Sequence, residues 1–218
     1  MHQLVSIDME KDLLEANRRL ANDNHDLLKK NEIISVDLMG SIGSGKTLLI
    51  ERLAELLRSK DRRVGVITGD VAGDDDFKRV SSLEDVKAVN VNTGKECHID
   101  AHLAEHAIED MDLGSIDVLL IENVGNLVCP ADFPLGADKR AVIISVTEGD
   151  DMVRKHPLIF RIADIVVINK SDLAEIMEVD LEVLKNDLET VKPGARLVIT
   201  DAKHGIGIED LAQAMGLL

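Results

Sequence analysis

Seven short apolar runs recur along this chain of 218 residues, and stretches long enough for helices lie between them. The runs are rich in Val and Ile and nearly continuous, which is typical of parallel strands covered on both faces. They occupy 33–39, 64–68, 86–91, 117–123, 140–147, 164–170 and 195–200. Intervening stretches such as 48–59, 101–109 and 181–189 suit crossover helices. The pattern therefore predicts an α/β fold, a doubly wound and mostly parallel sheet with helices on both faces.

The segment before the first apolar run has a different character. Residues 1–32 are polar and charged, with Leu13, Leu20 and Leu27 at heptad spacing. We expect an N-terminal helical extension over 1–32, followed by one domain over 33–218. Two interpretations of the leucines stay open: a helix packed on its own domain, or a contact with a partner or second subunit.

The charge balance limits the classes of partner. Lys and Arg number 25 against 41 Asp and Glu, for a net charge near −16, and the chain has no Trp and no Tyr. Such a surface repels phosphate backbones and offers few stacking platforms, so we expect no nucleic-acid partner and no membrane partner. The charged N-terminus has no apolar signal segment, which predicts a cytoplasmic location. In a reducing cytoplasm, the two cysteines are thiols that serve either as ligands or as small core residues.

The stretch GSIGSGKT, residues 40–47, follows the first run and opens the first predicted helix. Glycines let successive N–H groups surround an anion, and the helix N-terminus adds positive potential. This pattern predicts a P-loop NTPase, with Lys46 on the outer phosphates and the Thr47 hydroxyl on Mg²⁺. The predicted backbone cradle consists of Gly40, Ser41, Gly43, Ser44 and Gly45.

The stretch Asn169–Lys170–Ser171–Asp172 after the sixth run favours guanine over adenine. The carboxylate of Asp172 can accept from guanine N1–H and the exocyclic amino group, a donor pair that adenine lacks. Asn169 and Lys170 are predicted to hold the base. Ala202 lies in a segment that resembles the loop closing over guanine in GTPases. The expected substrate is GTP, with GDP as product.

Acidic residues at strand ends are candidates for hydrolysis and for holding Mg²⁺. Glu122 should approach the metal, and Gly125 can offer its N–H to the γ-phosphate. Asp70 and Asp76 are alternatives for ligating Mg²⁺ or ordering the attacking water. We expect Lys46, Asp70, Asp76 and Glu122 to carry catalysis, with Thr47, Asp70 and Glu122 on the metal. No glutamine or arginine finger is evident from the sequence, so slow intrinsic turnover is expected.

A second group of residues suits a softer metal. Cys97, His98 and Cys129 follow predicted strands, at the edge of the sheet where ligands bind. Thiolate and imidazole together favour Zn²⁺ or Ni²⁺. His102 and His106 would share a helical face with His98 if the helix began there, and they form a possible second site. The alternatives are buried apolar thiols and solvated histidines. Three ligands leave tetrahedral zinc incomplete, so an open position or a second subunit would complete it.

The motifs together resemble the HypB family of hydrogenase nickel-insertion GTPases. GSIGSGKT, NTGKECHIDAH, IENVGNLVCPADFPLG, TEGDDMVRKHP and VINKSDL are similar to that family's motifs, in its order. The resemblance covers about 33–203. The related urease nickel-loading GTPases, which typically carry Cys-Pro-His, remain an alternative, but here Ala131 follows Cys129–Pro130.

The resemblance implies a GTP-dependent homodimer with Cys97, His98 and Cys129 as interfacial ligands for nickel or zinc. It also implies two partners, the small zinc protein HypA and the [NiFe]-hydrogenase large-subunit precursor. Lys155 would reach toward the nucleotide of the opposite subunit. The cysteine-rich and histidine-rich N-terminal metal motifs of some family members do not occur in this chain. Two other functions stay open, a small-molecule kinase using ATP and a non-hydrolysing scaffold with structural zinc.

Overall fold

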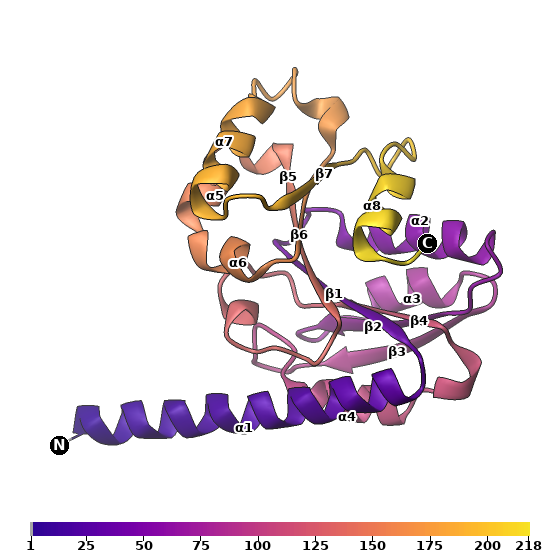
Figure 1. The fold of residues 1–218 in the computed structure, drawn as a ribbon, viewed down its shortest axis with the longest axis vertical. Coiled ribbons are helices and arrows are strands. Elements are labelled where there is room, and N and C mark those ends of the chain that lie inside the picture. Colours follow the sequence, from indigo (N-terminus) through magenta and orange to yellow (C-terminus); the bar gives the residue numbers. More distant parts are fainter. Residues whose placement is uncertain (1) are drawn as a thin grey trace.

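The computed structural model describes residues 2–218, with the surroundings of side chains described from Lys11 onward. Within this range the chain forms one seven-stranded sheet in which every paired strand is parallel, in the order β3-β2-β4-β1-β5-β6-β7 (Figure 1). The strands are β1 (Ile34–Gly40), β2 (Val64–Asp70), β3 (Val86–Asn92), β4 (Val118–Glu122), β5 (Lys139–Ser145), β6 (Ile165–Asn169) and β7 (Arg196–Ile199). The predicted doubly wound sheet is confirmed.

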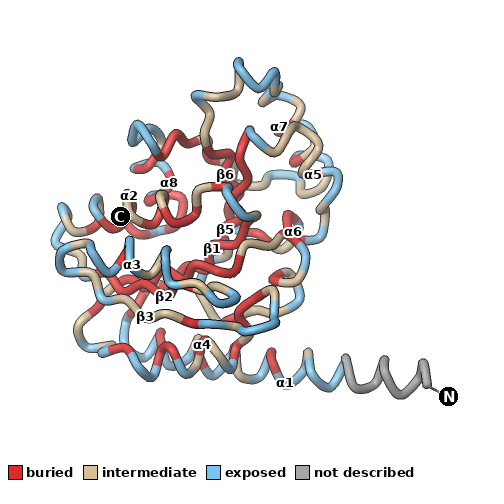
Figure 2. Tube along the Cα trace, turned by 180° about the vertical axis from the view of Figure 1, so that it is seen from behind, coloured by how far each residue is buried: buried red, intermediate tan, exposed pale blue. Residues whose placement is uncertain are grey.

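Helices cover both faces of the sheet. One face packs against α2 (Lys46–Arg58), α3 (Asp75–Ser81) and α8 (Ile208–Met215). The opposite face packs against α1 (His2–Lys30), α4 (Ala101–Glu109), α5 (Met152–Lys155), α6 (Pro157–Ile162) and α7 (Leu181–Val191). Short 3₁₀ helices occur at Leu113–Ser115, Cys129–Ala131, Val146–Glu148 and Ser171–Leu173. Buried residues concentrate on the central strands (Figure 2), as continuous apolar runs require. No helix among residues 2–218 is both long enough and apolar enough to cross a membrane.

The helix α1 packs on its own domain through a face that the leucine spacing did not indicate. From Lys11 onward, its buried residues are Asn17, Ala21, Asn24 and Leu28, whereas Leu13 is 59% exposed. The two buried asparagines bond to the backbone near the start of α4 and after the Cys129–Ala131 helix, and α1 lies beside α4 (Figure 1). The part of α1 around Asn17 and Asn24 therefore packs on the domain of its own chain. A contact between Leu13 and a partner stays a prediction.

Replacement of Asn24 by alanine is expected to lower the free energy of unfolding by about 1–3 kcal/mol, because it removes the donor from two buried carbonyl groups. Asn24 Nδ2 donates to Ala101 O at 2.9 Å and to Leu135 O at 3.0 Å. Urea denaturation followed by circular dichroism measures the change. The exposed Asn22 on the same helix is the matched control, and its replacement by alanine should change stability by less than about 0.5 kcal/mol. Equal effects of the two substitutions would contradict the role of the Asn24 bonds.

The topology brings polar side chains from separate segments to one edge of the sheet. The strand β1 is central, and the chain leaves its carboxyl end through the glycine-rich loop into α2. β2 ends at Asp70, β4 at Glu122 and β6 at Asn169. Because parallel strands share this edge, all three side chains lie at the rim where open α/β sheets bind ligands.

Candidate functional site

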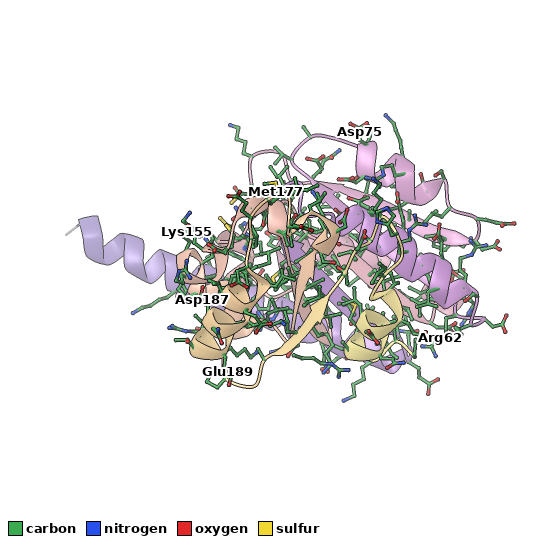
Figure 3. All side chains as sticks on the ribbon, turned by 90° about the horizontal axis from the view of Figure 1, so that it is seen from above. Arg62, Asp75, Lys155, Met177, Asp187 and Glu189 are labelled. Carbon is green, nitrogen blue, oxygen red and sulfur yellow. The ribbon has the colours of Figure 1, made fainter. Side chains whose placement is uncertain are left out.

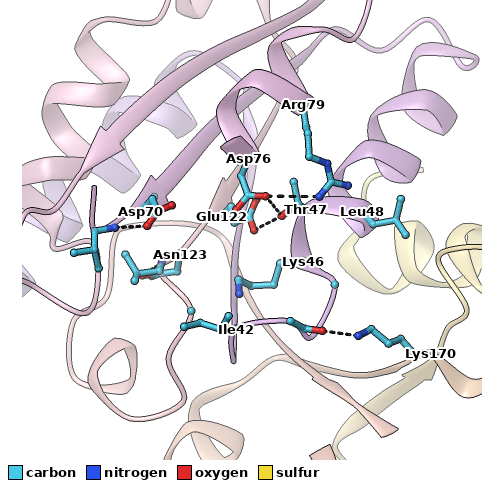
Figure 4. Close-up of a pocket in the computed structure, with 16 residues that line it drawn as sticks. Ile42, Lys46, Thr47, Leu48, Asp70, Asp76, Arg79, Glu122, Asn123 and Lys170 are labelled. Atoms are coloured by element: carbon cyan, nitrogen blue, oxygen red, sulfur yellow. Dashed lines mark hydrogen bonds and ion pairs between the residues drawn. The ribbon is translucent and has the colours of Figure 1, made fainter. Parts of the chain in front are cut away.

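The loop between β1 and α2 forms one wall of a cavity of about 380 Å³ (Figure 4). Gly45 caps α2 in the left-handed region (φ 97°), and a Cβ there would lie 2.4 Å from Asn169 Nδ2, so only glycine fits. Lys46 Nζ donates to Gly40 O at 3.1 Å and to Ser41 O at 3.0 Å, and burial lowers its pKa. Two carbonyl groups of the loop thus hold the Lys46 ammonium group inside the curve of the backbone.

Three oxygen-bearing side chains meet beside Lys46. The Thr47 hydroxyl lies 2.8 Å from Asp76 Oδ1 and 2.8 Å from Glu122 Oε1, and can donate to either (Figure 4). Burial, with the nearby Asp76 carboxylate, raises the pKa of Glu122 to about 7. Among the described residues, the buried Glu122 Oε2 has no hydrogen-bond partner. An oxygen set with an unpaired buried carboxylate oxygen fits Mg²⁺, which prefers such hard ligands.

The structure distinguishes the two aspartates that the sequence left as alternatives. Asp76 lies with Thr47 and Glu122, whereas Asp70 lines the same cavity but its Oδ1 accepts from Val71 N at 2.6 Å. Asp76 rather than Asp70 is therefore the third member of the oxygen group. Arg79 also lines the cavity, although no arginine was expected there. Its guanidinium makes two bonds to Glu51, at 2.9 and 3.0 Å, and its Nη1 also lies 3.7 Å from Asp76 Oδ1.

The stretch after β6 supports the phosphate loop and borders a second cavity of about 220 Å³. Asn169 Nδ2 donates to Ser44 O at 2.9 Å, and Lys170 Nζ donates to Gly43 O at 2.7 Å. Asn169 Oδ1 accepts from Ala202 N at 3.2 Å, which ties in the segment before α8. The exposed Asp172 lines this cavity, where its carboxylate is accessible to a base.

Cys97, His98 and Cys129 come together although they lie on different segments. One ligand atom from each lies within 4.8 Å of the others. His98 is buried and its ring packs on Phe133 with centroids 4.0 Å apart. Burial lowers the pKa of His98, which favours the neutral imidazole that binds metals. The hydrogen bond with Cys97, together with burial, raises the pKa of the Cys129 thiol, so metal binding there must release a proton.

The other histidines on this segment are separate from that cluster. The helix α4 begins at Ala101, so His98 precedes it and does not share its face with His102 and His106. The imidazoles of His102 and His106 are exposed, with their Nε2 atoms 3.3 Å apart.

Lys155 lies at the outer edge of the molecule, well away from Asp75 at the start of α3 (Figure 3), and pairs with Asp151 at 2.6 Å.

Three polar residues at the site were not assigned a role from the sequence. Asn123 is fully buried beside Glu122 and bonds to the backbone of Ile99 and Val124. Glu148 bonds to the Ser41 hydroxyl and lies near Lys46. His204 bonds through Nδ1 to Asp201, which approaches Asp172. The sequence signal for Asn123 and Glu148 was their presence inside the ENVGN and TEGDD motifs, whereas His204 had none.

The fold and this site define a P-loop nucleotide-binding protein that carries a thiol–imidazole cluster. The cluster is connected through Asn123 to the cavity of the glycine-rich loop, which we call the phosphate cavity. A family model described as the CobW/HypB/UreG nucleotide-binding domain matches residues 34–199. The chain belongs to this family, and within it to the HypB hydrogenase maturation factors.

Relatives across both archaea and bacteria support this assignment. The chain is 48% identical over 213 residues to the probable hydrogenase maturation factor HypB of Methanocaldococcus jannaschii, covering 98% of this chain and 96% of that protein. The crystal structure of HypB from Archaeoglobus fulgidus superposes with a TM-score of 0.84 at 46% identity, covering 91% of this chain and 96% of that one. HypB from Helicobacter pylori, crystallised in complex with nickel, gives 0.86 at 35% identity, covering 91% and 92%. The resemblance noted in the sequence is thus confirmed.

Proposed function

We propose that the protein is a GTP-hydrolysing metallochaperone that assists nickel insertion into a [NiFe]-hydrogenase. The observation that carries the proposal is the position of the cluster of Cys97, His98 and Cys129. The segment 122–129 begins at Glu122, whose Oε1 belongs to the oxygen set suited to Mg²⁺, and ends at Cys129 of the cluster. One short segment therefore borders both sites. The nickel-bound structure of the Helicobacter pylori relative supports nickel as the ion delivered.

The arrangement around the phosphate cavity supports the proposed hydrolysis. Lys46 would neutralise the outer phosphates, and Thr47, Asp76 and Glu122 would hold Mg²⁺. When bound, Mg²⁺ would neutralise charge that develops on the phosphate oxygens. Gly125 lines the cavity and would offer its N–H to the γ-phosphate, while Asp70 lies where it could order water. Since the Arg79 guanidinium is already paired with the carboxylates of Glu51 and Asp76, slow intrinsic turnover remains our expectation.

GTP specificity is proposed to rest on Asp172. Replacement by asparagine should weaken GTP binding by about 100-fold, because an amide presents a donor to the donors of guanine and loses charge-assisted bonds. The same variant should gain affinity for XTP, whose base carries a carbonyl group in place of the exocyclic amine. Competition between labelled GDP and each triphosphate measures both effects. An unchanged order of GTP and XTP affinities in the variant would contradict the role of Asp172. A preference of the wild type for ATP would instead support the small-molecule kinase.

The assembly and partners belong to the same proposal. We expect residues 1–32 to act as an extension of a GTPase domain at 33–218 in a cytoplasmic protein. In the GTP form the domain would form a homodimer that completes the metal site, with Lys155 reaching the opposite nucleotide. HypA and the hydrogenase large-subunit precursor are the proposed protein partners, and His102 with His106 a possible second metal site. Some relatives are named hydrogenase/urease maturation factors, which makes urease a second candidate recipient.

The central test compares nickel affinity in the presence of GDP with that in the presence of a non-hydrolysable GTP analogue. If the two ligands are linked, binding calorimetry should give dissociation constants that differ by at least about fivefold, as is typical of allosteric coupling. Light scattering on the same samples should show a dimer with the analogue. Equal affinities and an unchanged mass would favour the scaffold with structural zinc.

A further inference from the structure

The two segments that carry the cluster of Cys97, His98 and Cys129 are connected to the nucleotide in different ways. Cys129 follows Gly125 by four residues on the same loop, so movement of that loop reaches it along the chain. Cys97 and His98 lie on another segment, between β3 and α4. A nucleotide-dependent metal site therefore needs a contact that carries the state of the ENVG loop, residues 122–125, to this second segment.

The side chain of Asn123 makes that contact. Its Oδ1 accepts from Ile99 N at 3.1 Å and from Val124 N at 3.0 Å. Ile99 is the residue after His98, and Val124 precedes Gly125, the proposed γ-phosphate contact. Asn123 is fully buried, so water cannot replace these bonds. One oxygen atom thus joins the backbone of the metal-bearing segment to the backbone of the nucleotide-facing loop.

The orientation of the Asn123 amide is fixed from the sheet. Its Nδ2 donates to Asp37 Oδ1 at 3.1 Å. Asp37 lies within β1, paired in register with Ile121 on one side and Arg140 on the other, and cannot shift without breaking the sheet. The amide therefore has its donor directed to a carboxyl group and its acceptor directed to two N–H groups. Rotation or withdrawal of Asn123 would leave Ile99 N, a buried donor, without a partner.

We propose that Asn123 is the positioning residue that couples nucleotide state to the Cys97–His98 half of the metal site. The inference rests on the proposed linkage between GTP and nickel. When the loop moves toward a γ-phosphate, the Asn123 amide pivots on its bond to Asp37 Oδ1, so that its Oδ1 moves with Val124. Ile99 follows because its buried N–H keeps its acceptor. His98, adjacent to Ile99, then changes position relative to Cys129.

The test is the ratio of nickel dissociation constants with GDP and with the GTP analogue, measured in wild type, Asn123→Ala and Asn24→Ala. Asn24 is the matched control: it is a buried asparagine that bonds to two backbone carbonyls near the same segments but makes no hydrogen bond to the ENVG loop. The ratio in wild type should be at least about fivefold and should persist in Asn24→Ala. In Asn123→Ala it should fall to within about twofold of one.

The outcomes separate the two proposals. A wild-type ratio of one overturns the linkage itself and the role of Asn123 with it. A wild-type ratio preserved in Asn123→Ala overturns only the role of Asn123. Should that variant fail to fold, amide hydrogen exchange in the wild type decides: the protection of Ile99 N and Val124 N should change together when the analogue replaces GDP. A change at Val124 with none at Ile99 contradicts the proposal.

Discussion

Replacement of Cys129 by alanine is expected to lower nickel affinity in the GTP form by at least about 100-fold, while GDP affinity stays within about twofold. Removal of groups that only orient metal ligands typically costs 10–100-fold in affinity, so loss of a ligand should cost at least as much. The effect should be this large because the cluster has three ligands among the described residues, and the substitution removes one of them. GDP binding should be preserved because the Cys129 thiol contacts Asn126 and Cys97 and does not line the phosphate cavity.

The control for this substitution is the double variant His102→Ala/His106→Ala, which removes two exposed imidazoles outside the cluster. We expect it to change the nickel affinity of the Cys97–His98–Cys129 cluster by less than about threefold in the GTP form. Calorimetry with nickel, and separately with zinc, measures both variants. Loss of high-affinity binding in the histidine variant, with binding unchanged in Cys129→Ala, would move the delivered ion to α4 and refute the assigned site.

The fold could be predicted because strands that are buried on both faces appear in the sequence as nearly continuous apolar runs. The apolar run 117–123 became β4 (Val118–Glu122), and 164–170 became β6 (Ile165–Asn169). Once the strands are parallel, their carboxyl ends share an edge, so the proximity of Cys97 and Cys129 also followed from the order of elements. These inferences need only local patterns and one rule of topology.

Features that depend on contacts between distant segments could not be predicted in this way. Leucine spacing indicated one face of α1, but Asn17 and Asn24 are buried because backbone groups near Ala101 and Leu135 need partners. The choice between Asp70 and Asp76 depends on where α3 begins and how it approaches Thr47. The single-sequence pattern also gives no sign that Asn123 lies against Ile99. In each case a polar side chain is placed by an acceptor or donor far away in the sequence.

Asp37 gives the second large prediction, because it is a carboxyl group fully buried in the middle of the sheet. Burial raises the pKa of Asp37 to about 7, against the lowering effects of the Asn123 bond and the Arg140 charge. In the unfolded chain the group ionises near 3.8, whereas in the folded chain it stays protonated up to about pH 7. The folded state therefore binds more protons than the unfolded state between these values. The contribution of Asp37 to the free energy of unfolding therefore falls as pH rises from about 4 to 7, and it levels off above pH 7.

The substitution Asp37→Asn removes the titrating carboxyl group, and with it the loss of stability as pH rises. The new side chain keeps an oxygen that can accept from Asn123 Nδ2. The variant's free energy of unfolding, relative to wild type, should increase by about 3 kcal/mol between pH 5 and pH 8. Urea denaturation at a series of pH values measures the difference, and Glu122, whose pKa is also raised, cancels because it is present in both proteins. Asp117→Asn is the control: the hydrogen bond from Arg63 holds the pKa of Asp117 at about 2, so this carboxylate is ionised in both states throughout the range. A pH-independent difference for Asp37→Asn would mean that Arg140 keeps Asp37 ionised in the sheet, and the fixed donor–acceptor orientation of Asn123 would then be set by a carboxylate rather than by a carboxylic acid.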